Sequence, residues 1–203
     1  MHSLNPRTVV RQLVRERRNK LSHNQQNDAA TLLKEQLIKH PKIKNAQHIA
    51  LYLSNDGELD TTPFILWCWQ NNKKVYLPVL HPFSACNLIF LQYEPTTHMS
   101  SNMFGIKEPQ LNVNKVCPIL QLDILCTPLV AFDKTGARLG MGGGFYDRTL
   151  ANWYENSQQR IKQRLYPIGV AHDCQLVDHV PNDYWDVPLP EIITPTSTYC
   201  PAQ

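Results

Sequence analysis

Glycine is concentrated in one short segment of this chain. Only 8 of the 203 residues are Gly, and five of these lie between Gly136 and Gly144. Average usage is roughly 7% Gly, so the remainder of the chain is poor in glycine. Because Gly enters left-handed backbone conformations without steric cost, this segment has backbone demands that the rest does not share. Any fold proposed for the chain must explain why glycine is needed in this segment.

The segments on either side suggest what the loop does. Residues 123–132 are mostly apolar and predict a strand, in which Pro128 marks the end or an edge position. Residues 145–165 predict a helix. A strand, a glycine loop and a helix N-terminus together form a cradle of converging N–H groups for an anion, most naturally a phosphate. Arg138 at the loop entry adds a bidentate phosphate donor.

Two common phosphate-binding loops do not fit this segment. The Walker A motif needs a Gly-Lys pair, and no Gly in the chain is followed by Lys. A dinucleotide-binding pattern starting at Gly140 would need a third Gly at position 145, where the chain has Phe145. A glycine-rich bend that only lets a helix pack closely on a strand stays open as the structural alternative.

The rest of the chain alternates between helical and strand patterns. Helices are predicted over 6–20, from a capping box at Ser22 and Gln25 to about Pro41, and after Asp60 or Thr61. Strands are predicted over 48–54, 74–80, 87–93, 166–171 and 192–194, with an irregular loop over 94–120. We therefore expect one α/β domain over 1–203, with three layers and a largely parallel central sheet flanked by helices.

Composition excludes several classes of protein. The chain is 42% hydrophobic with a formal net charge of +3, which is too apolar and too weakly charged for disorder. The six cysteines have no Cys-x-x-Cys spacing, which argues against a structural zinc site and against a disulfide framework. No window approaches the ~20 apolar residues of a membrane span. We expect a reduced, cytoplasmic protein that is a monomer and binds no membrane.

Several charged residues have both a plain and a functional interpretation. The first helix carries one stripe of arginines: Arg7, Arg11, Arg15 and Arg18. This stripe has three interpretations: a solvated helix face, a phosphate-binding site or a surface that binds nucleic acid. Asp147 in the first turn of a helix either complements the helix dipole or binds Mg²⁺ beside phosphates.

Two further acids have only weak local support. Glu58 follows a strand end, where ligands bind in α/β sheets, but the local sequence favours an ordinary turn acid. Asp186 has the pattern of a solvated loop acid.

A long motif makes the chain recognisable. Pro128 to Asp133, followed by Gly136-x-Arg-Leu-Gly-x-Gly-Gly-Gly-Phe-Tyr-Asp-Arg148, resembles the signature of the 5-formyltetrahydrofolate cyclo-ligase family, also called methenyltetrahydrofolate synthetases. The similarity extends over nearly the whole chain and is greatest to the bacterial branch. It includes the basic first helix, Tyr52–Ser54 with Gly57–Asp60, the Tyr76–Val79 segment, the Gly105–Pro109 stretch, and Asp186 with Ile193-Thr-Pro195.

The resemblance implies an ATP- and Mg²⁺-dependent ligase of folate one-carbon metabolism. The implied reaction converts 5-formyltetrahydrofolate, with or without a polyglutamate tail, to 5,10-methenyltetrahydrofolate, ADP and phosphate. It passes through a phosphorylated formyl (imidate) intermediate, so it needs positioning and charge neutralisation rather than a protein nucleophile.

The resemblance also implies roles for residues that match by position. Arg138 would be catalytic, Asp147 and Asp186 would be the magnesium-associated acids, and the helix over 6–20 would be part of the ATP site. The ATP-binding positions are Arg7, Arg11, Arg138, Leu139, Gly140, Met141, Gly142, Gly143, Gly144, Phe145 and Tyr146. The folate-binding positions are Leu53, Glu58, Phe104, Met141, Gly142, Gly143, Gly144 and Phe145.

Four positions depart from the commonest family pattern. Arg7 stands where Lys is frequent, Met141 and Gly143 stand where other members carry basic residues, and Phe145 replaces a frequent Tyr. Fewer loop cations would shift phosphate binding to Arg138 and the first helix. Two other hypotheses remain: a phosphotransferase acting on another small molecule, and a nucleic-acid binder, which the modest charge argues against.

Overall fold

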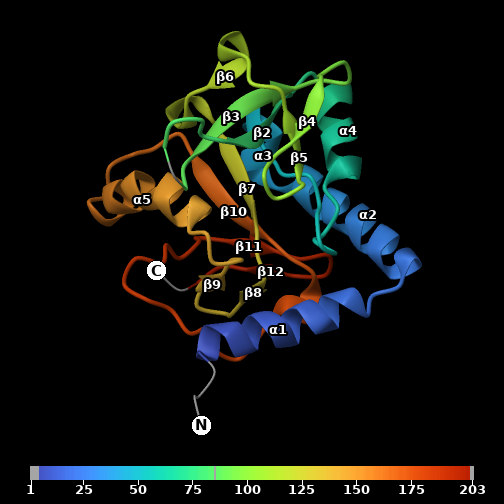
Figure 1. Cartoon of the computed structure of the whole chain (residues 1–203), viewed down its shortest axis with the longest axis vertical. Coiled ribbons are helices and arrows are strands. Elements are labelled where there is room, and N and C mark those ends of the chain that lie inside the picture. Colours follow the sequence, from blue (N-terminus) through green and yellow to red (C-terminus); the bar gives the residue numbers. More distant parts are fainter. Residues whose placement is uncertain (1–4, 85, 202–203) are drawn as a thin grey trace.

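An eight-stranded sheet forms the centre of the computed structural model, which describes residues 5–84 and 86–201 (Figure 1). The order is β12-β11-β10-β7-β1-β2-β3-β6. The strands are β1 (His48–Ala50), β2 (Lys74–Leu80), β3 (Leu88–Tyr93), β6 (Val116–Cys117), β7 (Ile124–Pro128), β10 (Tyr166–Val170), β11 (Ile192–Ile193) and β12 (Thr198–Tyr199). The neighbours from β11 to β2 are parallel, and the three outer pairs are antiparallel.

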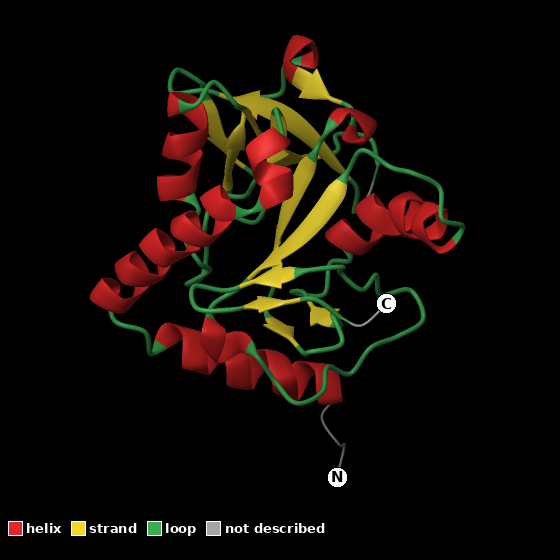
Figure 2. Cartoon of the chain, turned by 180° about the vertical axis from the view of Figure 1, so that it is seen from behind, coloured by secondary structure: helices red, strands yellow, loops and turns green. Residues whose placement is uncertain are grey.

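Helices cover both faces of this sheet (Figure 2). They are α1 (Pro6–Asn19), α2 (His23–Lys39), α3 (Pro41–Asn45), α4 (Thr62–Gln70) and α5 (Phe145–Gln158), with 3-10 turns η1 (Val113–Lys115), η2 (Ile119–Gln121) and η3 (Asp173–Gln175). Ile49 packs in the cluster that holds Leu37 of α2 and Phe64 of α4. Its neighbour Ala50 packs with Leu150 of α5. Since successive strand residues point to opposite faces, the sheet is the middle of three layers.

Helix α1 lies at one end of the sheet rather than on a face (Figure 1). Its Val14 packs with Val130, Leu139 and Val180 around the small hairpin β8 (Ala131–Phe132) and β9 (Arg138–Leu139). A second small hairpin pairs β4 (Met99–Ser101) with β5 (Lys107–Pro109). These additions surround the carboxyl ends of β1, β2 and β7, which is where parallel sheets place their sites.

The predicted α/β class with a mostly parallel sheet is confirmed, and several element bounds are corrected. The predicted helix over 145–165 ends at Gln158, because the chain turns away at Arg160, whose φ is +56°. The predicted strand over 48–54 ends at Ala50. The strand predicted over 123–132 ends at Pro128, and its last residues form β8 of a separate hairpin.

The prediction of one domain over 1–203 stays a prediction, because residues 1–4, 85 and 202–203 lie outside the described part. Within the described ranges, none of the helices has the length and apolar character to span a bilayer.

Candidate functional site

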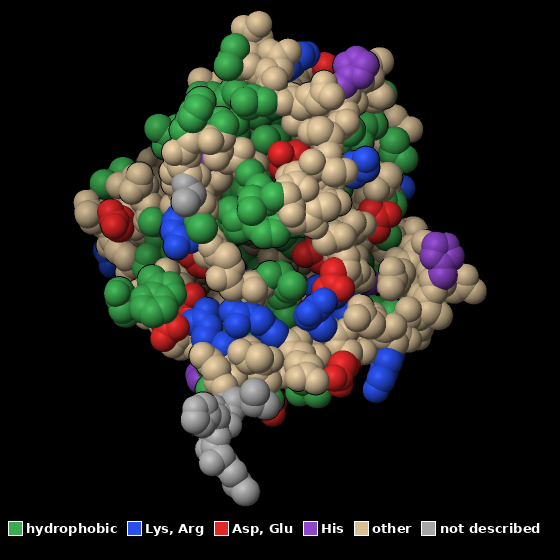
Figure 3. Space-filling model, in the orientation of Figure 1, with side chains coloured by type: hydrophobic (Ala, Val, Ile, Leu, Met, Phe, Trp, Pro, Cys, Tyr) green, Lys and Arg blue, Asp and Glu red, His purple; other side chains and the backbone are tan. Residues whose placement is uncertain are grey.

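A cavity of about 1030 Å³ opens at the carboxyl ends of β1, β2 and β7. Its wall is formed by α1, the loop after β1, the 102–108 segment, the glycine loop and the 183–186 loop. Every residue that the sequence predicted for ATP, folate or metal lines this cavity except Leu139, which is fully buried beneath α1. Figure 3 shows basic side chains gathered along α1, just below a hollow with hydrophobic side chains. One cavity therefore unites positions that are up to 179 residues apart.

The glycine loop uses conformations that other residues avoid. Gly142 has a φ of +104° and Gly144 a φ of +65°, and Gly144 is the N-cap of α5. A Cβ on Gly140 would meet no atom within 4 Å, so this part of the loop faces open space. The first N–H groups of α5 have no partners within the helix, and the positive end of the helix dipole points the same way. The loop has the geometry of an anion cradle.

The first two arginines of α1 reach the far side of the cavity. Arg7 donates to both carboxylate oxygens of Asp186 at 2.6 and 3.0 Å and to Asp183 at 2.6 Å. These bonds hold the pKa of Asp186 below its usual value, against the raising effect of burial. Arg11 donates from Nε to the carbonyl oxygen of Gly140 at 2.8 Å, which ties the helix to the glycine loop.

The last two arginines of the stripe hold the loop after β1. Arg15 and the fully buried Arg18 both donate to Oδ2 of Asp56 at 2.8 Å. Asp56 has a φ of +50° and Gly57 a φ of +73°, so these bonds stabilise a tight left-handed turn. The stripe is not simply a solvated helix face, because Arg18 is buried and all four arginines are bonded within the chain, although the Arg15 side chain is still 43% exposed.

Glu58 ends this turn inside the cavity. Its carboxylate accepts a hydrogen bond from the backbone N–H of Asn55 at 3.1 Å. Burial raises the pKa of Glu58 to about 7, with the negative charge of Asp56 adding to the rise. A desolvated carboxyl group facing a cavity is suited to accept hydrogen bonds from a ligand's N–H groups. Glu58 is half-buried, so its carboxyl group is more shielded than that of an ordinary solvated turn acid.

Hydrophobic side chains line the same part of the cavity. Leu53 follows β1, and Phe104 and Phe145 meet edge to face with ring centroids 6.1 Å apart. Phe145 also covers Gly143, where an added Cβ would lie 2.5 Å from the Phe145 ring. Flat apolar walls beside one half-buried carboxyl group suit a flat heterocycle with N–H donors.

Asp147 forms an ion pair with the buried Arg138 beneath the glycine loop. Nη2 of Arg138 donates to Oδ1 of Asp147 at 2.8 Å, and the backbone N–H of Val187 donates to the same oxygen at 3.2 Å. Arg138 is only 5% exposed, its Nε has no partner, and burial lowers its pKa. Asp147 therefore has a role that the sequence did not predict, as the counter-ion of a buried cation.

Two carboxylates are available for a metal ion. Asp147 and Asp186 both line the cavity, and the backbone cradle for phosphates lies beside them. No group of three or more His, Cys, Asp or Glu side chains within the described ranges is placed to hold a metal alone. Mg²⁺ takes one or two carboxylates together with phosphate oxygens, so this donor set fits Mg²⁺ carried by a nucleotide.

Sequence reasoning missed several residues of the site. Asp183 and Asp56 bind the arginines of α1, yet nothing near either in the chain predicts a partner on that helix. Glu108 lines the cavity and accepts from the backbone N–H of Leu80, which closes the 102–108 segment over β2. Only Glu108 had a signal, because it lies in the Gly105–Pro109 stretch of the family resemblance.

Comparisons with known proteins identify the family. Residues 4–195 match the model of the 5-formyltetrahydrofolate cyclo-ligase family. The chain belongs to this family. It is 48% identical over 187 residues to the 5-formyltetrahydrofolate cyclo-ligase of Escherichia coli K12, an alignment covering 92% of this chain and 99% of that protein. It is 49% identical to the enzyme of Haemophilus influenzae, covering 92% and 96% of the two chains. The predicted family and its bacterial relatives are confirmed, and the chain is a ligase of this family.

Solved structures agree with the fold. The 5,10-methenyltetrahydrofolate synthetase of Aquifex aeolicus superposes with a TM-score of 0.78 at 26% identity, covering 97% of this chain and 93% of that one. The synthetase of Mycoplasma pneumoniae superposes with a TM-score of 0.71 at 24% identity, covering 94% and 99%. The cyclo-ligase family thus accounts for the fold as well as for the motif.

Proposed function

We propose that this enzyme converts 5-formyltetrahydrofolate to 5,10-methenyltetrahydrofolate with consumption of Mg²⁺-ATP and release of ADP and phosphate. The observation that carries the proposal is the cavity itself. The glycine loop, the buried Arg138 and the half-buried Glu58 line the same cavity, which supports a site where a phosphate donor and an N–H-bearing heterocycle meet. The bacterial relatives that match nearly this whole chain have names that state this ligase activity.

The folate would occupy the end of the cavity near Glu58. The Glu58 carboxylate would accept hydrogen bonds from the pterin N–H groups, with Leu53 against the ring. Phe104 and Phe145 form an aromatic wall beyond it. With the pterin held there, the N5 formyl group would face the glycine loop. A glutamate tail of any length would extend beyond the aromatic wall.

The triphosphate would occupy the cradle. Backbone N–H groups of Gly140 to Phe145, together with Arg7, Arg11 and Arg138, would bind its oxygens, with Met141 and Tyr146 as neighbours. Asp147 and Asp186 would hold Mg²⁺, whose positive charge would offset that of the phosphate oxygens. Leu139 does not line the cavity, because its side chain is buried under α1 and its carbonyl oxygen accepts a hydrogen bond from the backbone N–H of Val130 at 2.8 Å.

The chemistry follows from this placement. The formyl oxygen attacks the γ-phosphorus, the bond from phosphorus to the β–γ bridging oxygen breaks, and ADP leaves with that electron pair. N10 then attacks the activated carbon and loses its proton, and phosphate leaves with the carbon–oxygen pair. Arg138 is the group we assign to stabilise charge on the transferring phosphoryl group, because it is fixed and desolvated. No protein nucleophile is needed.

We also propose that the enzyme acts in the cytoplasm as a monomer. All six cysteines are free thiols, which is typical of a reducing compartment.

The deciding experiment is the appearance of methenyl absorbance from 5-formyltetrahydrofolate. We expect product only when ATP and Mg²⁺ are both present, with ADP formed in equal amount. Absence of product from folded protein with all three components would overturn the proposal. Release of ADP with another acceptor, but none with the folate, would instead identify a different phosphotransferase.

A further inference from the structure

An arginine outside the large cavity holds the end of the glycine loop. Arg148 lies at the start of α5, is exposed, and does not line the cavity. Its Nη1 donates to the carbonyl oxygen of Gly143 at 2.8 Å, and its backbone N–H donates to the carbonyl oxygen of Gly144 at 3.1 Å. One residue therefore binds the carbonyl groups of the last two glycines of the loop. The function proposed above gives Arg148 no part.

The place of Arg148 in its helix makes this contact informative. Arg148 comes four residues after Gly144, the N-cap of α5. The N-terminus is the positive end of a helix dipole, so a cation is unfavourable there and is better placed in the last turn. A charge-assisted hydrogen bond to a carbonyl oxygen offsets that cost. The contact with the loop, and not the helix itself, accounts for a cation at this position.

The peptide group between Gly143 and Gly144 is enclosed on two sides. A Cβ on Gly143 would lie 2.5 Å from the ring of Phe145, and a Cβ on Gly144 would lie 2.5 Å from Nη1 of Arg148. Gly144 also has a φ of +65°, which favours glycine. An aromatic ring and a guanidinium group therefore occupy the space around this peptide group and fix its orientation.

This orientation decides which polar groups the loop offers to an anion. In a trans peptide group the N–H points opposite to the C=O. Since the carbonyl groups of Gly143 and Gly144 are turned toward Arg148, the N–H groups of Gly144 and Phe145 point away from it. Gly144 and Phe145 line the large cavity. Reversal of either peptide group would present a partial negative charge to a phosphate in place of a donor.

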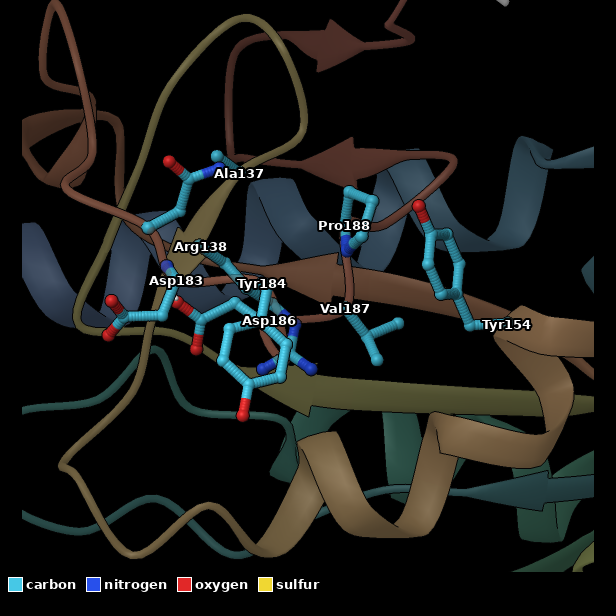
Figure 4. Close-up of a pocket in the computed structure, with 9 residues that line it drawn as sticks. Ala137, Arg138, Tyr154, Asp183, Tyr184, Asp186, Val187 and Pro188 are labelled. Carbon is cyan, nitrogen blue, oxygen red and sulfur yellow. Dashed lines mark hydrogen bonds between the residues drawn. The ribbon is translucent and has the colours of Figure 1, made fainter. Parts of the chain in front are cut away.

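The start of the loop is held in a different way. Arg11 donates to the carbonyl oxygen of Gly140, and Arg138 and Asp186 also line a smaller cavity of about 230 Å³ (Figure 4). Both arginines line the large cavity as well, so phosphates bound there compete with their present partners. Arg148 lines neither cavity, so a nucleotide does not compete for its bond to the loop.

We propose that Arg148 is a positioning residue of the anion cradle, which keeps the carbonyl groups of Gly143 and Gly144 turned away from the cavity so that the N–H groups of Gly144 and Phe145 bind phosphate oxygens of ATP. The inference rests on the proposed ATP dependence. Arg148 does not touch the nucleotide. It acts through the backbone of the loop, and it stays bound while Arg11 and Arg138 exchange partners.

Steady-state kinetics of methenyl formation test this role. Arg148→Ala should raise the KM for ATP about fivefold, the scale of losing one exposed charge-assisted hydrogen bond, and leave the KM for folate unchanged. Arg148→Lys keeps a cationic donor for the Gly143 carbonyl group and should restore most of the affinity for ATP. Arg17→Ala is the matched control, since Arg17 is an exposed helical arginine that lines neither cavity. Thermal melting should show that all three variants are folded.

A second measurement observes the loop without turnover. The chain has eight glycines, so selective ¹⁵N labelling of glycine gives a simple amide spectrum of the full chain. Labelling the glycine carbonyl carbons as well identifies Gly143 and Gly144, because only these two follow another glycine. Adding Mg²⁺-ATP should shift the Gly144 signal strongly in the wild type and much less in Arg148→Ala.

The outcomes separate this role from its alternatives. An unchanged KM for ATP and an unchanged Gly144 shift in Arg148→Ala would overturn the positioning role while ATP-dependent methenyl formation persists. Equal rises in both KM values together with a lower melting temperature would also overturn it, because Arg148 would then serve only the stability of α5. A folded wild-type chain with neither ATP-dependent product nor a Gly144 shift would overturn the proposed function itself.

Discussion

The two ends of the large cavity are built in opposite ways. At the folate end, one half-buried carboxyl group, Glu58, lies beside apolar side chains and has a single backbone donor, from Asn55. At the phosphate end, the charged groups are paired with one another, Arg7 with Asp186 and Arg138 with Asp147. The first end has an incompletely satisfied acceptor, whereas the second has cations and anions that already neutralise each other.

Because the two ends differ in this way, ligand binding changes the hydrogen bonds and ion pairs of each end differently. A ligand at Glu58 supplies hydrogen bonds that the protein lacks, so binding there depends on the ionisation of one group. A magnesium-bound triphosphate at the other end exchanges partners, because its phosphates compete for Arg7 and its metal for Asp186. Mutations at the phosphate end should therefore lower turnover or the affinity for ATP, whereas changes at the folate end should alter the affinity for folate and its pH dependence.

The largest effect is expected for Asp147→Asn. Asn keeps an oxygen for the hydrogen bond from Arg138 but loses the charge that attracts Mg²⁺. We expect kcat to fall about 100-fold, the scale of removing one group that stabilises transition-state charge. The free energy of unfolding should fall by only about 1–3 kcal/mol, the scale of weakening one buried polar interaction. Methenyl absorbance at several Mg²⁺ concentrations and thermal melting measure the two effects.

Asp178→Asn is the matched control for this change, since Asp178 is exposed and lines neither cavity. If Asp147→Asn leaves turnover intact and changes only stability, Asp147 is the counter-ion of Arg138 and nothing more.

The next effect separates the two ends directly. Arg11→Ala removes the bond to Gly140 and a cation beside the cradle, so we expect the KM for ATP to rise about tenfold. The KM for folate should rise much less. Arg17→Ala, on the exposed side of the same helix, should change neither constant. A larger rise in the KM for folate than in the KM for ATP would assign Arg11 to the folate end and contradict the division of the cavity into two ends.

Glu58 should make folate affinity depend on pH. Its pKa is raised from 4.5 to about 7 by burial, so the carboxylate that accepts the pterin N–H groups forms only as pH rises through 7. Between pH 6 and 8 the KM for folate should fall about tenfold, with the KM for ATP little changed. Glu58→Gln should flatten that profile, and a profile that stays steep in Glu58→Gln would assign the titration to another group.

The same shift has a consequence for stability. The folded state binds the proton of Glu58 more tightly than the unfolded state does, so this group favours folding below pH 4.5. That contribution is lost as pH rises from 4.5 through 7. The Glu58→Gln variant should lack this part of the pH dependence of unfolding.

The smallest effect is expected for Asp56→Asn. The weaker bonds from Arg15 and Arg18 should loosen the left-handed turn that carries Glu58. We expect a few-fold rise in the KM for folate with kcat and the KM for ATP unchanged. Asp28→Asn, an exposed acid on α2, is the control. An equal rise in both KM values would show that α1 transmits the change to the phosphate end.

Local sequence patterns predicted the glycine cradle and the arginine stripe, because spacing along one element determines which side chains share a face. They could not predict which groups the stripe meets. Asp183 and Asp56 reach Arg7 and Arg15 only through the folding of distant segments. The end of α5 was equally hidden, because Arg160 takes a positive φ without the Gly that usually marks such a helix end. Only the family resemblance predicted that Glu58 and Asp186 belong to the site, because the local sequence pattern of both residues favoured solvated acids.

Helix α1 makes contacts from Arg7 through Arg11 to Arg18, and those contacts serve both ends of the cavity. A residue inserted between Arg11 and Arg15 would turn one half of the helix by about 100° relative to the other. Either Arg7 or Arg18 would then face away from its partner, whatever residue was added. In evolution, residues of this helix can therefore be substituted one at a time. A single insertion or deletion would instead break the contacts of α1 with one end of the cavity at once.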